Sequence, residues 1–132
     1  MNYWMVKSEP NSYSWNDFES KGEDVWDGVR NFQARNFLKD MQLGDQVLFY
    51  HSGKEKSIVG IAEVSREAYP DPLDNSWVAV DIKVNKKLLH PISLAQIKAE
   101  DRLSDLRMLK QSRLSVSPVE KDEFQLIVKM GS

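Results

Sequence analysis

The chain has 132 residues, 41% of them hydrophobic and 29% charged, and its 18 basic and 20 acidic side chains give a net charge of −2. That length suits one domain, the composition excludes an intrinsically disordered chain, and the lack of cysteine excludes disulfides and thiol chemistry. No apolar run approaches the roughly 18 residues of a membrane helix, and no signal-peptide block is present, so we expect a cytoplasmic protein, or a nuclear one if its source is eukaryotic.

The N-terminal part of the chain alternates between strand and helix signals. Residues 3–7 are rich in aromatic and β-branched side chains and predict a strand. Ser14 is followed three residues later by an acid, a capping pattern that predicts a short helix over residues 15–20. Val25 and Trp26 predict a brief second strand that ends at a turn.

The clearest helix follows Asn31, a favoured N-cap residue. Its apolar side chains recur at helical spacing, at Ala34, Phe37, Leu38 and Met41. Gly44 stands where a helix commonly ends in a left-handed residue, so we expect the helix to stop there.

The remainder of the chain predicts mostly strands, then a closing helix. We expect strands over residues 46–50, 58–65, 77–84, 88–92 and 113–116, and helices beginning at Ser93, at Ser104 and near Glu120. Gly60 lies inside a predicted strand and indicates a bulge or a close backbone approach. Pro91 cannot donate to a neighbouring strand and predicts an edge position, while Pro118 is expected to break the strand before it.

Short strands with helices between and after them predict an α+β fold. We expect one domain spanning residues 1–132, built on a small, curved, barrel-like sheet.

Charge is distributed unevenly along the chain. Residues 1–50 hold 5 basic and 8 acidic side chains, whereas residues 102–113 hold four basic side chains against one acid. A local basic stripe on a nearly neutral body fits weak backbone contact around a specific pocket better than broad coating of a duplex. A solvated helix face explains the stripe equally simply.

The sequence lacks the familiar signatures of enzymes and metalloproteins. It contains no phosphate-binding loop, dinucleotide fingerprint or nucleophile elbow. The two histidines, His51 and His90, are far apart and have no cysteine beside them, so we expect neither a metal site nor a cofactor.

Ten of the thirteen aromatic residues lie in residues 1–50; some must belong to the core, and a ring in a loop would have a second use. Special residues also gather at predicted strand ends, in Lys7-Ser8-Glu9-Pro10, in Trp26-Asp27-Gly28-Val29-Arg30-Asn31, in Phe49-Tyr50-His51-Ser52, and in residues 113–119. In order and spacing these segments, with Gln33-Ala34-Arg35-Asn36, resemble the EVE domain, the module of the thymocyte nuclear protein family and of stand-alone bacterial proteins.

The resemblance implies a fold of the PUA-like superfamily, a curved, mostly antiparallel β-barrel with flanking helices. That superfamily includes YTH domains, which hold a methylated adenine in an aromatic cage. EVE domains are thought to read modified bases, including modified cytosine in DNA and modified bases in RNA. We therefore expect a non-enzymatic reader whose partner is a nucleic acid carrying a modified base, without a membrane or a metal and in monomeric form.

The chemistry of the matched residues suits this reading. An extruded base needs an aromatic face, hydrogen-bond partners for its edge, and cations for the flanking phosphates. The expected base pocket comprises Ser8, Glu9, Trp26, Gly28, Val29, Asn31, Tyr50, His51, Ser52 and Ser115. The expected phosphate contacts are Lys7, Arg30, Arg35, Lys110 and Arg113.

Each assignment has a structural alternative that stays open. Trp26 could be ordinary core, Asn31 only a helix cap, and His51 a hydrogen-bonded structural residue. Glu9 could pair with an arginine as a structural bridge, and Arg35 could form a salt bridge instead of a phosphate contact. Trp77 opens an alternating strand and is interpreted as core.

Two rival functions also stay open. The same pocket could belong to an enzyme that modifies a base or nucleoside. The acidic balance of the chain also fits a small-molecule or protein-interaction module that has lost nucleic-acid binding.

Overall fold

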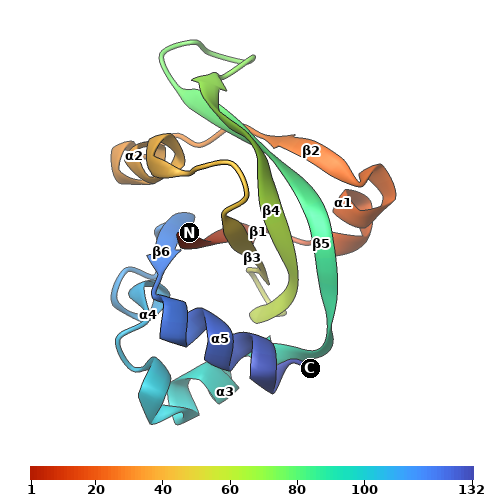
Figure 1. Ribbon diagram of the computed structural model, residues 1–132, viewed down its shortest axis with the longest axis vertical. Helices are drawn as coiled ribbons and strands as arrows, with labels where there is room; N and C mark the ends of the chain where they lie inside the picture. Colours follow the sequence, from red (N-terminus) through yellow and green to blue (C-terminus); the bar gives the residue numbers. More distant parts are fainter.

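A computed structural model describes all 132 residues (Figure 1). Six strands form one sheet: β1 (Tyr3–Ser8), β2 (Glu23–Trp26), β3 (Gln46–His51), β4 (Ser57–Pro70), β5 (Val78–Ser93) and β6 (Val116–Val119). The helices are α1 (Trp15–Lys21), α2 (Phe32–Asp40), α3 (Leu94–Ala99), α4 (Arg107–Lys110) and α5 (Lys121–Met130), with a 3-10 turn at Asp101–Leu103. None of these helices has the length and apolar character needed to cross a bilayer.

The sheet is mixed and strongly curled (Figure 1). Its strand order is β2-β5-β4-β3-β1-β6, and only β1 and β3 run parallel to one another. The edge strands β2 and β6 do not pair with each other, so the curled sheet does not close into a barrel. The predicted α+β class and mostly antiparallel curved sheet are confirmed, with flanking helices as expected.

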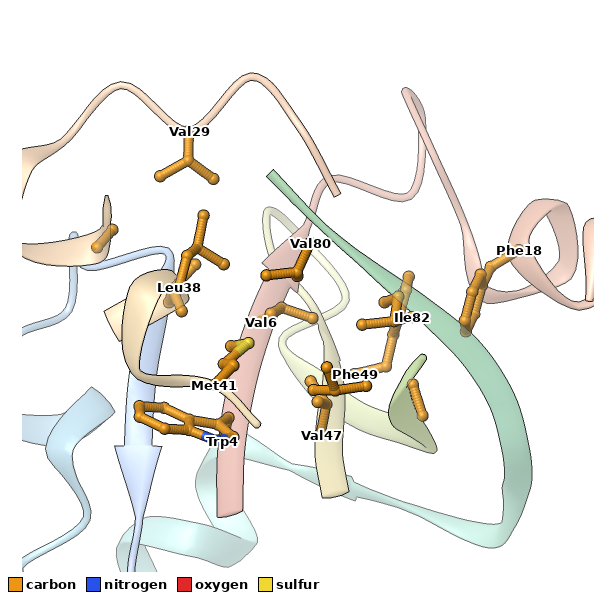
Figure 2. Close-up of a cluster of buried hydrophobic side chains, with 14 of the residues drawn as sticks. Trp4, Val6, Phe18, Val29, Leu38, Met41, Val47, Phe49, Val80 and Ile82 are labelled. Atoms are coloured by element: carbon orange, nitrogen blue, oxygen red, sulfur yellow. The ribbon is translucent and has the colours of Figure 1, made fainter. Parts of the chain in front are cut away.

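Alternation along the strands divides the core between the two faces of the sheet. In β3, Val47 and Phe49 join one apolar cluster, to which α1 and α2 contribute (Figure 2). The neighbouring Leu48 and Tyr50 join a second cluster, which takes its helical residues from the C-terminal third of the chain. Successive side chains of a strand point to opposite faces, so this division fixes which residues can share a pocket.

Three of the predicted helix N-caps are confirmed. Ser14 and Asp17 form the reciprocal capping box of α1, and Ser93 forms one with Gln96 in α3. Asn31 caps α2, accepting the Ala34 N–H at 2.9 Å. Because α2 ends earlier than expected, at Asp40, Gly44 belongs to the following turn, where its φ is +89°.

Gly60 fulfils both expectations for a strand glycine. The β3–β4 and β4–β5 registers both shift beside it. A methyl group in its place would lie 2.5 Å from ring atoms of Trp15. The missing side chain therefore lets the fully packed indole of α1 lie against the sheet.

Several other predicted boundaries were wrong, among them the strand expected over residues 113–116, which is observed at Val116–Val119. β5 is a single strand of 16 residues instead of two, and β2 pairs only with Val80–Lys83. Pro91 therefore lies where one side of β5 is open, a local edge that needs no backbone donor. Pro118 lies inside β6, which tolerates it as an edge strand. Ser104 ends the 3-10 turn instead of starting a helix, because Leu103 and Leu106 are both drawn into the core by consecutive tight turns.

Candidate functional site

A pocket of about 440 Å³ opens beside the end of β1 and along β2. Three segments of the chain contribute to it: the last residue of β1, the approach to α1 with the end of that helix, and β2 with the residue after it. Its lining residues are Ser8, Tyr13, Lys21, Asp24, Val25, Trp26 and Asp27. This volume lies in the range of about 300–1,000 Å³ usual for small-ligand sites.

Two aromatic rings form the apolar part of the pocket. Tyr13 and Trp26 meet edge to face, with ring centroids 6.3 Å apart. Trp26 in turn rests edge-on against the fully buried Phe49, at 5.6 Å. Trp26 is half-buried, so its indole is anchored on the core while part of it remains open to a ligand.

The polar part of the pocket is acidic. Asp24 accepts hydrogen bonds from the Tyr13 hydroxyl at 2.5 Å and from the Val25 N–H at 2.8 Å, and it pairs with Lys21 at 3.3 Å. Burial alone would raise the pKa of Asp24, but these hydrogen bonds outweigh it and lower the pKa below its ordinary value.

Of the other polar groups in the pocket, the hydroxyls of Tyr13 and Ser8 form hydrogen bonds within the chain, and the Asp27 carboxylate forms none. Burial and the neighbouring Asp24 raise the pKa of Tyr13 well above its ordinary value, which keeps its hydroxyl neutral. The Ser8 hydroxyl donates to the carbonyl of Tyr13. Asp27 has no hydrogen-bond or ion-pair partner within the chain, so the pocket carries one free carboxylate beside the aromatic rings.

The segment from Gly28 to Arg30, which follows the pocket residues of β2, is held in place by Asp71, a residue that the sequence analysis did not single out. Asp71 lies between β4 and β5 with its side chain fully buried, and it accepts the Gly28 N–H at 2.9 Å. The same carboxylate pairs with Arg30 at 3.0 Å, and its other oxygen accepts the Leu73 N–H at 2.7 Å. Gly28 adopts φ +75°, so glycine is favoured at this turn. A local signal for Asp71 existed, an acid between Pro70 and Pro72, but its partners were not readable from the sequence.

A stack of cations and aromatic rings lies beside this segment. The exposed Phe32 stacks on Trp77 at 5.2 Å between centroids. The Arg35 guanidinium lies 4.9 Å from the Phe32 centroid and 5.5 Å from that of Trp77, and it forms no hydrogen bond or ion pair. Arg30 lies 5.6 Å from the Trp77 centroid. Trp77 was predicted to be core, but it is only half-buried, because its ring packs on an exposed phenylalanine instead of the sheet interior.

The expected base pocket does not form as one site. Trp26 and Ser8 line the first pocket, whereas Tyr50, Ser52 and the cation Lys7 line a second one. The cause is strand alternation: Phe49 supports Trp26 on one face of β3, and Tyr50 therefore points to the other.

Other expected pocket residues have structural partners. His51 is buried; its Nε2 accepts the Trp15 N–H at 2.9 Å, so its ring proton lies on Nδ1, 2.9 Å from Glu55. Val29 is buried in the first apolar cluster. The backbone carbonyl of Ser115 accepts the Lys7 N–H, and Ser115 lines neither pocket.

Asn31 and Arg113 lie apart from the first pocket, in a shallow depression of about 320 Å³ beside Gln111. Glu9 forms no bridge to Arg30 or Arg113; its carboxylate lies against Gly53.

The basic stripe is largely neutralised by partners. Lys110 pairs with Asp105 at 3.2 Å, and Arg102 pairs with Glu100 at 2.8 Å, an acid just outside the stripe. Arg107 donates to Gln111, and only Arg113 has no side-chain partner. Arg35 is thus a better candidate for a phosphate contact than Lys110. No group of three or more His, Asp and Glu side chains converges on a point that could hold a metal ion.

Known proteins resemble the chain along nearly its whole length. Mouse thymocyte nuclear protein 1 is 33% identical over 98% of this chain and 73% of its own. A Rhodopseudomonas palustris protein solved by NMR is 50% identical and superposes with a TM-score of 0.95, covering 99% of this chain and 93% of its own. Human THYN1, solved in complex with DNA containing 5-methylcytosine, is 30% identical, with a TM-score of 0.93 over 100% of this chain and 98% of its own.

The fold extends to more distant proteins. The YTH domain of a Zygosaccharomyces rouxii protein, solved with N6-methyladenosine RNA, superposes with a TM-score of 0.65 at 15% identity over 98% of this chain and 83% of its own. The fold is therefore the PUA-like and YTH-like one that the sequence led us to expect. The EVE domain model matches residues 2–130, and the chain belongs to the EVE domain family.

Proposed function

We propose that this protein is a non-enzymatic reader that holds one modified cytosine of DNA in the pocket between Tyr13 and Trp26. The observation that carries the proposal is a half-buried indole, fixed on Phe49 and facing carboxylates, in a chain 30% identical to human THYN1, whose structure contains 5-methylcytosine DNA. The base would leave its stack and enter the pocket, as enzymes and readers that inspect single bases require.

The pocket chemistry matches the edge of cytosine. Carboxylates accept hydrogen bonds from the cytosine amino group, and both Asp24 and the unpartnered Asp27 lie in the lining. Stacking of a base on an aromatic ring contributes about 1–3 kcal/mol, which Trp26 can supply. A methyl group on the ring adds apolar surface that Tyr13 and Trp26 can cover.

The surroundings of the pocket suit a strand of nucleic acid. Arg35 offers unpaired donors beside the exposed ring of Phe32, a combination that binds phosphate and stacks a flanking base. The Ser8 hydroxyl donates to the backbone carbonyl of Tyr13. His51 is its cross-strand partner, but both ring nitrogens of that histidine are engaged, by the Trp15 N–H and by Glu55. This arrangement favours binding over covalent chemistry.

Titration by fluorescence anisotropy tests the proposal. The probes are short DNA strands with cytosine, 5-methylcytosine or 5-hydroxymethylcytosine at one position, and RNA strands with 5-methylcytosine or N6-methyladenosine. We expect the wild type to bind one modified DNA more tightly than its unmodified counterpart. Trp26→Ala should abolish that preference, at a cost of about tenfold or more in affinity, while Trp26→Phe retains part of it.

A matched tryptophan outside the pocket supplies the control. Trp77→Ala should weaken binding to every strand without changing the ratio between modified and unmodified DNA. Equal binding of all strands by the wild type would refute the reader. A preference for modified RNA would move the proposal to RNA, and a mass change of the probe after long incubation would point to an enzyme instead.

A further inference from the structure

A second pocket, of about 330 Å³, lies on the opposite face of the sheet from the first. It opens between the end of β1, the loop after β3 and the helices α3 and α4. Its lining residues are Lys7, Tyr50, Ser52, Gly53, Lys56, Leu94, Lys98, Met108, Leu109 and Ser112. The reader function proposed above uses none of them.

The lining of this pocket is predominantly basic. Three lysines, Lys7, Lys56 and Lys98, line it, and none of them forms an ion pair. No carboxylate is among the lining residues, although that of Glu9 lies against Gly53. The Lys7 ammonium donates to the Ser112 carbonyl at 2.7 Å, which leaves further N–H donors for a ligand. Burial lowers the pKa of Lys7, as expected for an ammonium held without a counter-ion.

The wall of this pocket is apolar. Leu94 and Leu109 are half-buried, and Met108 is almost fully buried beside them. Tyr50 underlies the pocket, with the Lys7 nitrogen 5.7 Å from its ring centroid. An inorganic anion would leave this surface uncovered, so the pocket suits a ligand with a flat or apolar body and an anionic group.

Lys56 adds an independent observation. Its φ of +47° makes it the only residue other than glycine in the left-handed region. A lysine there is strained where glycine would not be, and strain of this kind gathers at binding sites. The conformation begins the approach to β4 and places a cation on the pocket lining.

We propose that this second pocket binds a nucleotide, with the base against Leu94, Met108 and Leu109 and the phosphate among the three lysines. The nucleotide is either a free mononucleotide or a unit of the strand whose modified base occupies the first pocket. Lys7 and Ser8 are consecutive in β1 and line the two pockets, so one strand passing the end of β1 could supply both. Only this second source rests on the function proposed above.

Calorimetric titration with deoxycytidine monophosphate tests the assignment, with deoxycytidine and inorganic phosphate as partial ligands. We expect the monophosphate to bind more tightly than either fragment. Lys98→Gln and Lys56→Gly should each weaken it about tenfold, the loss usual for one charge-assisted hydrogen bond. Lys54→Gln, which removes a charge from the same loop outside the pocket, should leave binding unchanged.

The Lys56→Gly variant also shows whether weaker binding could result from a less stable fold. Lys56→Gly relieves the left-handed strain, so we expect its melting temperature to equal or exceed that of the wild type while its affinity falls. Weaker binding by this variant is then a loss of the site and not of the fold.

Comparing the mononucleotide with longer DNA strands shows which of the two forms of nucleotide the second pocket binds. If mononucleotide binds in the wild type but not in the lysine variants, the site takes a free nucleotide. If only DNA strands of several nucleotides bind, and Lys98→Gln weakens them without altering the preference for modified cytosine, the site holds a neighbouring unit of the strand. If neither ligand distinguishes the lysine variants from the wild type, the proposal is wrong, whatever the result for Trp26.

Discussion

At the scale of single residues, Asp71 joins the pocket to the distant β4–β5 connection. Its buried carboxylate holds the backbone of Gly28 and the side chain of Arg30, one turn beyond Trp26. Burial would raise the pKa of Asp71, but the hydrogen bonds from Gly28, Leu73 and Arg30 outweigh that effect and lower it below its ordinary value.

Asp71→Asn should destabilise the fold by about 1 kcal/mol at neutral pH, because Arg30 loses its counter-charge at a site that water partly screens. A carboxyl with a lowered folded pKa stabilises the protein above its ordinary pKa near 3.8, and that stabilisation is lost as the pH falls through the folded value. The difference between wild type and variant should therefore shrink as the pH is lowered below the ordinary value of 3.8, as measured by urea unfolding.

The exposed, unpartnered Asp40 gives the control for this substitution. Asp40→Asn should change the free energy of unfolding by no more than about 0.5 kcal/mol. A constant difference between Asp71→Asn and wild type across the acid range would contradict the assigned role of the carboxylate.

Single residues also show where sequence reasoning reached its limit. Trp26 could be recognised as a pocket residue because its turn and family pattern are local. Tyr13, which also lines the pocket, carries no such pattern and meets Trp26 only through tertiary packing. Asp24 and Asp27 are close to Trp26 in the sequence, but no local signal showed that their carboxylates line the same pocket. Tyr50 was grouped with Trp26 because both are aromatic and near strand ends, although alternation in β3 separates them.

At the scale of elements, local chemistry predicted the caps well and the strand lengths poorly. The caps at Ser14, Asn31 and Ser93 depend on residues within four positions, so their pattern is visible in the sequence. The 16 residues of β5 continue through Pro91 because β2 covers only part of the strand, a fact of tertiary pairing.

Two substitutions of Asn31, the N-cap of α2, distinguish its role in helix stability from a role in ligand binding. Asn31→Ala should destabilise the fold by about 1 kcal/mol, since the Ala34 N–H loses its acceptor. Asn31→Asp keeps an oxygen acceptor at the positive end of the helix and should preserve stability. Thermal unfolding of both variants checks this pair of outcomes.

The same pair tests the sequence-based assignment of Asn31 to the base pocket. Asn31 lines the shallow depression beside Arg113 instead of the pocket of Trp26. We therefore expect Asn31→Asp to keep the wild-type preference for modified cytosine. Loss of that preference without loss of stability would return Asn31 to the base site.

At the scale of the whole molecule, a net charge of −2 limits how the protein can hold a polyanion. Few cations are free of partners near the first pocket, so we expect two or three phosphate contacts. The logarithm of the binding constant should then fall with the logarithm of salt concentration with a slope of about −2. Arg35→Gln should reduce the size of that slope by about 0.7–0.9, one phosphate contact.

Lys129, on the last turn of α5, provides the comparison for the salt titration. Lys129→Gln removes the same charge far from the pocket and should leave the slope unchanged. A slope near zero for the wild type would favour the small-molecule or protein-interaction module over the reader.

The order of strands in the sheet has a consequence for synthesis of the chain. β1 is made first, yet it lies between β3 and β6, and β6 is the last strand to be made. Until Val116–Val119 leave the ribosome, one side of β1 has unpaired backbone groups flanked by Trp4 and Val6. The nascent protein therefore carries an apolar, adhesive edge for most of its translation, and a message truncated just before β6 would yield a chain prone to aggregation.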